Sequence, residues 1–122
     1  PGTVERARYD QWCFFVLTEL EQPLWTIGKH KFALPEERRV PEIKETAVWE
    51  FKRAAAVFAK GLEGKKYLVG DHFTMADLLA VHTLTWARTA RILHDFESVE
   101  EYRKQQLSRA AFSRALEVET VE

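Results

Sequence analysis

The sequence predicts an all-α domain, an orthogonal bundle of five or six helices around a buried central helix. Apolar residues recur at intervals of three and four in several long stretches, which is the helical period. Alternation of the kind that strands show never persists over four residues. The stretch from Met75 to Leu84 is apolar on nearly every face, as in a helix that runs through the middle of a domain. A chain of 122 residues has the size of one domain, so we assign residues 1–122 to a single unit.

The first helix is expected from about Val4 to about Ile27. Thr3 is placed as its N-cap. Pro23 removes one intrahelical hydrogen bond, so the helix should kink there and stop before Gly28. One face carries the apolar residues Tyr9, Trp12, Val16, Leu20, Leu24 and Ile27.

Six consecutive apolar residues, from Trp12 to Leu17, exceed what one core-facing stripe can absorb. Two explanations fit equally well. The helix is buried on two sides by its own domain, or the excess forms an interface with a second subunit or another domain.

Residues 28–41 read as a loop with one helical turn after Pro35, and Pro41 is placed as the first residue of a second long helix. Gly61 and Gly64 are expected to end it. Its apolar stripe consists of Ile43, Ala47, Phe51, Ala55, Phe58 and Leu62.

The central helix has a strong start signal. Thr74 followed three residues later by Asp77 has the form of a capping box, and Phe73 with Leu78 has the spacing of a hydrophobic staple. We assign these four residues structural capping roles and expect the helix to continue to about Leu93.

Two short helices complete the expected fold. Ser98 with Glu101 has the form of a second capping box, which opens a helix to about Leu107. Ser108 is placed as the N-cap of a last helix, which carries Ala111, Phe112 and Leu116.

Composition excludes several classes of function. A net charge of -1 with scattered Lys and Arg leaves no basic stripe, so we expect no nucleic-acid partner. One Cys cannot form an intrachain disulfide, and the chain has neither a signal peptide nor a long apolar run. We therefore expect a cytoplasmic protein that does not bind membranes. The chain does not begin with Met, so it is expected to be either a processed product or a piece of a longer protein.

Three segments resemble a known family. YLVGDHFTMAD matches the phrase that opens the central helix of the C-terminal domain in cytosolic, bacterial-type glutathione S-transferases. ERARYDQW is similar to the start of that domain's first helix, and VEEYRKQQLSRAAFSRAL is similar to its final helices, with Ala110 where a Pro is common. The resemblance covers essentially the whole chain.

The resemblance implies half of an enzyme. Family members carry an N-terminal thioredoxin-like domain that binds glutathione and supplies the catalytic Tyr, Ser or Cys, and nothing in this chain corresponds to it. The full-length protein is expected to conjugate glutathione, its co-substrate, to hydrophobic electrophiles in detoxification. This chain alone should bind no cofactor and be inactive, and it should contribute the electrophile-binding surface and a homodimer contact through its first two helices. The alternative is a non-catalytic protein-interaction module.

By the same resemblance, the substrate-binding candidates are Tyr9, Trp12, Val16 and Trp86. For Trp12 and Val16, an ordinary core role is equally plausible. Tyr9 and Trp86 carry polar atoms that favour the edge of a cleft.

Two positions depart from the bacterial beta class of the family. Glu21 and Gln22 stand where beta-class enzymes tend to carry His and Lys, so the resemblance does not imply a beta-class substrate range.

The remaining reactive residues are assigned structural roles. Cys13 lies in an apolar run and is predicted to be a small buried hydrophobe rather than a nucleophile. His82 is predicted to be a core histidine, and the capping role explains Asp77. The four His show no metal-site spacing, so we predict no catalytic residue and no metal ligand in this chain.

Overall fold

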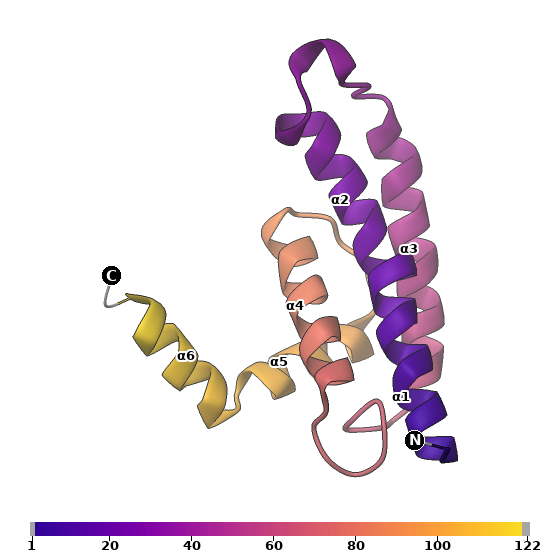
Figure 1. The fold of residues 1–122 in the computed structure, drawn as a ribbon, viewed down its shortest axis with the longest axis vertical. Coiled ribbons are helices and arrows are strands. Elements are labelled where there is room, and N and C mark those ends of the chain that lie inside the picture. Colours follow the sequence, from indigo (N-terminus) through magenta and orange to yellow (C-terminus); the bar gives the residue numbers. More distant parts are fainter. Residues whose placement is uncertain (1, 121–122) are drawn as a thin grey trace.

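The computed structural model describes residues 2–120, and every regular element within them is helical (Figure 1). The predicted all-α fold is confirmed. The first long helix packs beside α3. The helix α4 packs against the first half of that long helix and against α5, and α6 extends away from the bundle (Figure 1). The elements are α1 (Val4–Phe15), η1 (Val16–Glu21), α2 (Gln22–Gly28), η2 (Lys29–Ala33), η3 (Glu36–Arg38), α3 (Ile43–Leu62), α4 (Met75–Thr89), α5 (Glu97–Leu107) and α6 (Ala110–Thr120).

The first helix does not stop before Gly28, as the sequence had indicated. Helical structure continues from α1 through η1, α2 and η2 to Ala33. Gly28 has ordinary right-handed helical angles, and a Cβ built on it would lie 3.3 Å from the Phe32 ring. Gly28 therefore provides room for that ring. The helix ends before Leu34, which is extended because Pro35 follows it.

A π-helical segment, η1, lies directly before Pro23. Such wider turns absorb a disrupted hydrogen-bond pattern within a helix. Helical structure thus continues on both sides of Pro23.

Glycine has a different role in α3 from the one predicted. Gly61 lies inside the helix, and a Cβ built on it would stand 2.5 Å from Cη2 of Trp12. The helix ends at Leu62, followed by Glu63 and Gly64 with positive φ. Gly64 therefore lies just past the end, as predicted, whereas Gly61 permits close packing of the first helix on α3. The predicted stripe is buried from Ala47 to Leu62, with Ile43 half-buried.

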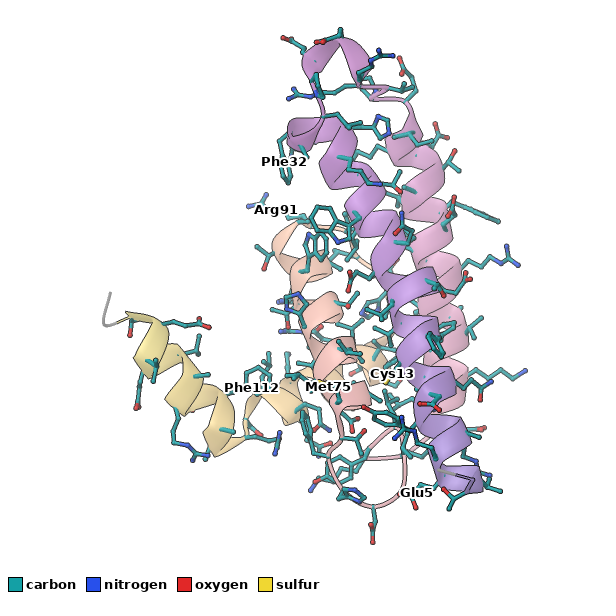
Figure 2. All side chains as sticks on the ribbon, viewed as in Figure 1. Glu5, Cys13, Phe32, Met75, Arg91 and Phe112 are labelled. Atoms are coloured by element: carbon teal, nitrogen blue, oxygen red, sulfur yellow. The ribbon has the colours of Figure 1, made fainter. Side chains whose placement is uncertain are left out.

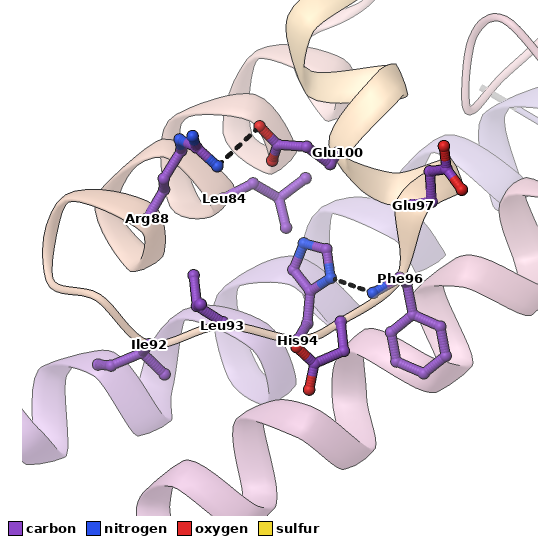
Figure 3. Close-up of a pocket in the computed structure, with 9 residues that line it drawn as sticks. Leu84, Arg88, Ile92, Leu93, His94, Phe96, Glu97 and Glu100 are labelled. Atoms are coloured by element: carbon purple, nitrogen blue, oxygen red, sulfur yellow. Dashed lines mark hydrogen bonds and ion pairs between the residues drawn. The ribbon is translucent and has the colours of Figure 1, made fainter.

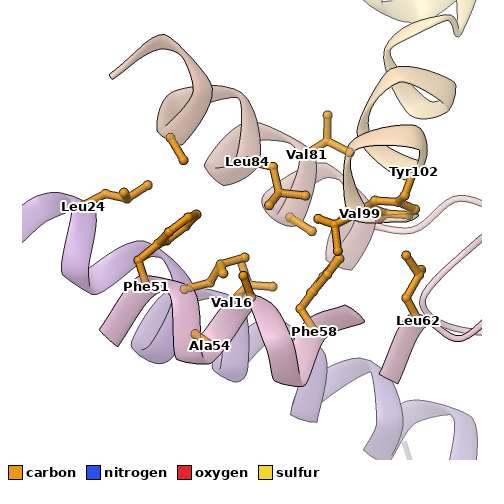
Figure 4. Close-up of a cluster of buried hydrophobic side chains, with 14 of the residues drawn as sticks. Val16, Leu24, Phe51, Ala54, Phe58, Leu62, Val81, Leu84, Val99 and Tyr102 are labelled. Atoms are coloured by element: carbon orange, nitrogen blue, oxygen red, sulfur yellow. The ribbon is translucent and has the colours of Figure 1, made fainter. Parts of the chain in front are cut away.

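The core is a single cluster between the first helix, α3, α4 and α5 (Figure 4). Phe51 and Phe58 of α3 are fully buried at its centre. Val99 and Tyr102 close it from α5 (Figure 4). Burial on this scale supplies most of the stabilisation of such a domain, at about 25 cal/mol per Å² of apolar surface.

The central helix, α4, buries one wide face rather than all of its surface. Ala80, Leu84 and Ala87 lie in the core, whereas Met75 is 52% exposed. His82 is also exposed, so its predicted role as a core histidine is wrong. The elements that pack against α4 are chiefly α1, η1 and α5.

The helix α4 ends at Thr89 instead of about Leu93. The Ile92 N–H donates to the Ala87 carbonyl at 2.8 Å and the Arg91 N–H to the Arg88 carbonyl at 3.0 Å, which is a Schellman motif. Arg91 occupies the left-handed position with φ of 60°. Because Gly usually marks this position, the sequence did not reveal the end of the helix.

Asp77 is fully buried and does more than cap α4. Its Oδ2 accepts from the Thr74 N–H at 3.1 Å, which is the carboxylate half of the predicted box. Its Oδ1 accepts from the Leu68 N–H at 3.0 Å and from the Tyr102 hydroxyl at 2.6 Å. Thr74 Oγ1 is positioned for the other half of the box but, within the described residues, makes no hydrogen bond. The carboxylate thus joins the loop before α4, the start of α4, and α5.

Arg109, between α5 and α6, covers one member of the predicted staple. The Phe73 ring lies under the Arg109 guanidinium, with its carbon 3.6 Å from the ring centre. Leu78 is 37% exposed.

Both serine caps predicted for the last helices are wrong. The N-cap of α5 is Phe96, whose N–H donates to His94 Nδ1 at 2.9 Å, and Ser98 lies within the first turn. Ser108 terminates α5, and its hydroxyl donates to the Gln105 carbonyl at 2.6 Å. The acceptor for the Phe96 N–H at the start of α5 is therefore His94, which the predicted capping pattern did not include.

Candidate functional site

Two tryptophans, one on α2 and one on α4, form an exposed aromatic edge. The Trp25 and Trp86 rings meet edge to face, with centroids 5.3 Å apart and planes at 89°. Trp25 is 44% exposed and Trp86 is half-buried. We call this pair the tryptophan edge. It exposes apolar aromatic surface to solvent.

The surroundings of the tryptophan edge are mixed. His82 lies one turn before Trp86, with ring centroids 6.5 Å apart. Glu21, half-buried, lies one turn before Trp25. The aromatic surface therefore has an imidazole and a carboxylate nearby on its two helices.

The structure separates the four substrate-binding candidates. Tyr9 lies near the start of α1, beside Thr74, and lines a shallow hollow there. Trp12 packs edge-on against Phe58 and over Gly61, while Val16 has no exposed surface. Of the four, only Trp86 belongs to the tryptophan edge. A ligand could reach Val16 only if the first helix moved.

Trp25 is the residue that sequence reasoning missed. It stands between Leu24 and Ile27 of the predicted stripe, but one position off the buried face. The sequence predicted a kink at Pro23 and a helix end before Gly28. Contact between Trp25 and Trp86 was therefore not expected. A large aromatic side chain off the buried face of a helix was the available signal.

The apolar run from Trp12 to Leu17 is only partly covered by the domain. Val16 is buried, and Trp12 and Phe15 are half-buried, but Phe14 is 67% exposed and Leu17 is 41% exposed. Burial on two sides by its own domain therefore does not account for these two residues. Figure 2 shows the side chains along this helix, with Glu5 near one end and Phe32 near the other.

Cys13 is half-buried, and burial raises the pKa of its thiol. Tyr9 lies one turn before Cys13, and the pKa of Tyr9 is also raised, chiefly by loss of solvent. A raised pKa disfavours the thiolate, which is the nucleophilic form. This agrees with the prediction that Cys13 is not a nucleophile.

A cluster of charges joins α4 to α5. Arg103, almost fully buried, binds both oxygens of Glu100 at 2.7 and 3.0 Å, and Arg88 binds the same carboxylate at 3.1 Å. The hydrogen bonds from Arg103 hold the pKa of Glu100 below its ordinary value. Nearby, Asp77 and burial keep the Tyr102 phenol protonated, because burial first and the hydrogen bond second raise the pKa of Tyr102. Neither Glu100 nor Tyr102 is poised to exchange a proton near neutral pH.

His94 has a pKa that is lowered from 6.5 by burial. Its Nδ1 accepts the Phe96 N–H only when that nitrogen is unprotonated. Between the lowered folded pKa and the unfolded value, the unfolded chain binds more protons, so stability falls as pH falls.

We expect thermal melts between about pH 7 and about pH 5 to show this loss of stability. The His94→Gln variant should show a smaller loss, because Gln keeps an acceptor for Phe96 but does not titrate. An identical pH dependence in the two proteins would contradict this role of His94. This pH range ends above the pH at which Glu100 takes up a proton. The pKa of Glu100 is lowered, so protonation of Glu100 destabilises the fold only at more acidic pH.

Within residues 2–120, no group of three or more His, Cys, Asp or Glu side chains is arranged to hold a metal ion. No helix in this part of the chain is long and apolar enough to cross a membrane.

Comparisons with known proteins give a consistent result. The family described as "Glutathione S-transferase, C-terminal domain" matches residues 20–109. A "Glutathione S-transferase-like protein LUC7" from Fusarium is 36% identical over 86 residues, which is 66% of this chain and 36% of that protein. The chain thus spans about a third of the length of this relative.

Solved structures show the same fold. A ternary complex of BphK, a bacterial GST, has a TM-score of 0.83 at 24% identity and covers 98% of this chain and 57% of that one. The glutathione transferase URE2P6 from Phanerochaete chrysosporium, in complex with oxidized glutathione, has a TM-score of 0.75 at 25% identity. It covers 96% of this chain and 55% of that one. The chain therefore spans little more than half of either structure.

Proposed function

The chain belongs to the family of glutathione S-transferase C-terminal domains, and we propose that it is the electrophile-binding half of a transferase that conjugates glutathione to hydrophobic electrophiles. The observation that carries the proposal is the tryptophan edge. Trp25 and Trp86 present aromatic surface to solvent on the two helices that the resemblance associates with the substrate.

In this proposal the domain binds and orients, and it supplies no catalytic group. A glutathione thiolate is held by a thioredoxin-like domain and attacks an electrophile that rests on the tryptophan edge. Holding the two reactants together replaces a bimolecular encounter with a positioned one, and an aromatic wall favours an apolar electrophile. Tyr9, at the other end of the first helix, remains a candidate contact through its hydroxyl.

Substitution of the tryptophan edge tests the proposal. In the protein that includes its thioredoxin-like domain, Trp86→Ala should raise KM for a chloronitrobenzene about 10-fold, because a buried aromatic contact is lost. The KM for glutathione should stay nearly unchanged, which serves as the internal control. Steady-state kinetics with each substrate varied in turn measures both values. An unchanged KM for the electrophile would show that substrate binds elsewhere.

A homodimer contact is the second part of the proposal. Trp49 is 60% exposed and Val57 is 54% exposed on α3, and with Phe15 of the first helix they line a hollow of about 390 Å³. Arg53 lies over the Trp49 ring at 5.5 Å. An exposed apolar face with polar neighbours is typical of subunit contacts.

A non-catalytic interaction module is the second candidate, and the exposed Phe14 and Leu17 favour it. A module would use these residues to bind a partner protein, whereas an enzyme would cover them with its own second domain. The segment encoded upstream distinguishes the two. A thioredoxin-like domain there supports the enzyme, and a different neighbour supports the module.

A further inference from the structure

A second cavity, separate from the tryptophan edge, lies between the end of α4 and the start of α5 (Figure 3). Its volume is about 260 Å³, and Tyr9, Trp25 and Trp86 do not line it. This is slightly below the roughly 300 to 1,000 Å³ of cavities that take drug-sized ligands, so a smaller molecule would fit. We call it the α4–α5 pocket.

The apolar lining of the α4–α5 pocket is fixed in place. Leu84 and Ile92 are buried, and Phe96 is half-buried against the core. Ile92 is held by the Schellman motif at the end of α4. Leu93 is 54% exposed. The pocket therefore has a rigid apolar floor with an aliphatic side chain at its rim.

Arg88 provides a positive charge that is not required to pair Glu100. Arg103 alone already binds both oxygens of Glu100, so the second partner, Arg88, is redundant for that carboxylate. The Arg88 side chain is 54% exposed, and one of its nitrogens is used in the contact at 3.1 Å. A guanidinium has five N–H donors, so Arg88 can bind a further anion without leaving Glu100 unpaired.

His94 supplies a neutral donor. Because its Nδ1 accepts from the Phe96 N–H, its ring proton lies on Nε2. Figure 3 shows that Nε2 points away from Phe96, toward the space beside Leu84 and Arg88. Two N–H donors of different kinds thus face the same apolar pocket.

The carboxylates at the rim do not occupy this position. Glu97 is exposed, and its carboxylate points away from His94 and Arg88 (Figure 3). Asp95 is also exposed, so its charge is screened by solvent and salt. Glu100 has both of its oxygens bound by Arg103, so its charge is balanced without Arg88. An anionic head group is therefore favoured beside Arg88 more than a cation is.

We propose that the α4–α5 pocket binds a small organic acid, with the carboxylate on Arg88 and His94 Nε2–H and the apolar body on Leu84, Ile92 and Phe96. This site goes beyond the proposed transferase function. It requires neither glutathione nor the thioredoxin-like domain, so either proposal can fail alone.

Titration of this chain with benzoate tests the assignment. Heteronuclear NMR should show saturable shifts of the His94 ring and of the Ile92, Leu93 and Phe96 amides. Arg88→Gln should weaken binding about 10-fold, since a charge-assisted pair is lost. Arg91→Gln is the matched control, because Arg91 is an exposed arginine just past the end of α4 that does not line the pocket, and it should bind like the unchanged chain.

Three ligands of similar shape test which head-group charge the pocket prefers. Benzoate should bind more tightly than benzyl alcohol, and benzylamine should bind least. Equal affinity for all three, or tighter binding of benzylamine, would overturn the assignment of an acid. So would an Arg88→Gln variant that keeps a native spectrum and binds benzoate normally, or the absence of saturable shifts up to the solubility limit of benzoate.

Discussion

We expect Asp77→Ala to lower the free energy of unfolding by about 3 kcal/mol or more, with a fall in Tm of roughly 10 °C. Three donors lose their acceptor at once, and two of these donors, the Leu68 N–H and the Tyr102 hydroxyl, are buried. A buried donor without a partner costs about 1 to 3 kcal/mol. A capping box alone would cost only about 1 kcal/mol, so the size of the effect separates a cap from a junction of three segments. Chemical denaturation followed by circular dichroism measures it.

Two further variants apportion the effect. Tyr102→Phe removes one donor and leaves Asp77 with the two backbone N–H groups, so it should cost about 1 kcal/mol. The double variant should cost less than the sum of the single ones, because the two residues share a hydrogen bond. A loss of about 1 kcal/mol or less for Asp77→Ala would show that the carboxylate serves the cap alone.

The second large effect is expected at Gly61, where Gly61→Val should destabilise the chain by about 2 to 3 kcal/mol. Any Cβ there would stand 2.5 Å from Cη2 and 2.8 Å from Cζ2 of Trp12. The Trp12 ring cannot move freely, because it packs edge-on against Phe15 and Phe58. The first helix and α3 must therefore separate, or Trp12 must leave its place.

Ala56→Val is the matched control, since Ala56 is exposed on the same helix. It should cost only the difference in helix propensity, which is below about 1 kcal/mol. Adding Trp12→Ala to Gly61→Val should cost less than the two single losses together. Equal stability of Gly61→Val and Ala56→Val would contradict the packing described.

The helical period predicted which faces of the long helices are buried, because burial there follows directly from residue spacing. Phe51, Phe58 and Leu62 lie in the core as expected. The ends of helices were predicted less well. Gly28 and Gly61 serve close packing inside helices, and Arg91 takes a left-handed position that Gly usually fills. A glycine that ends a helix and one that makes room for a ring look alike in sequence.

Contacts between segments that are far apart in the sequence could not be predicted either. The sequence predicted that Asp77 pairs with Thr74, which lies three residues away, but not with Tyr102. Likewise, Trp86 was a candidate through resemblance, whereas its partner Trp25 emerged only from the contact of the two rings in the structure. Local hydrogen bonds follow from spacing, but which helices lie side by side depends on the packing of the whole domain.

The central proposal is that this chain binds the electrophile while the chemistry resides in another domain. The most direct measurement is the rate of glutathione conjugation to a chloronitrobenzene, with this chain alone and with the chain preceded by its thioredoxin-like domain. We expect no turnover above the uncatalysed rate for the chain alone and clear turnover for the two-domain protein. Turnover by the chain alone, or a folded two-domain protein that binds glutathione yet conjugates nothing, would contradict the proposal.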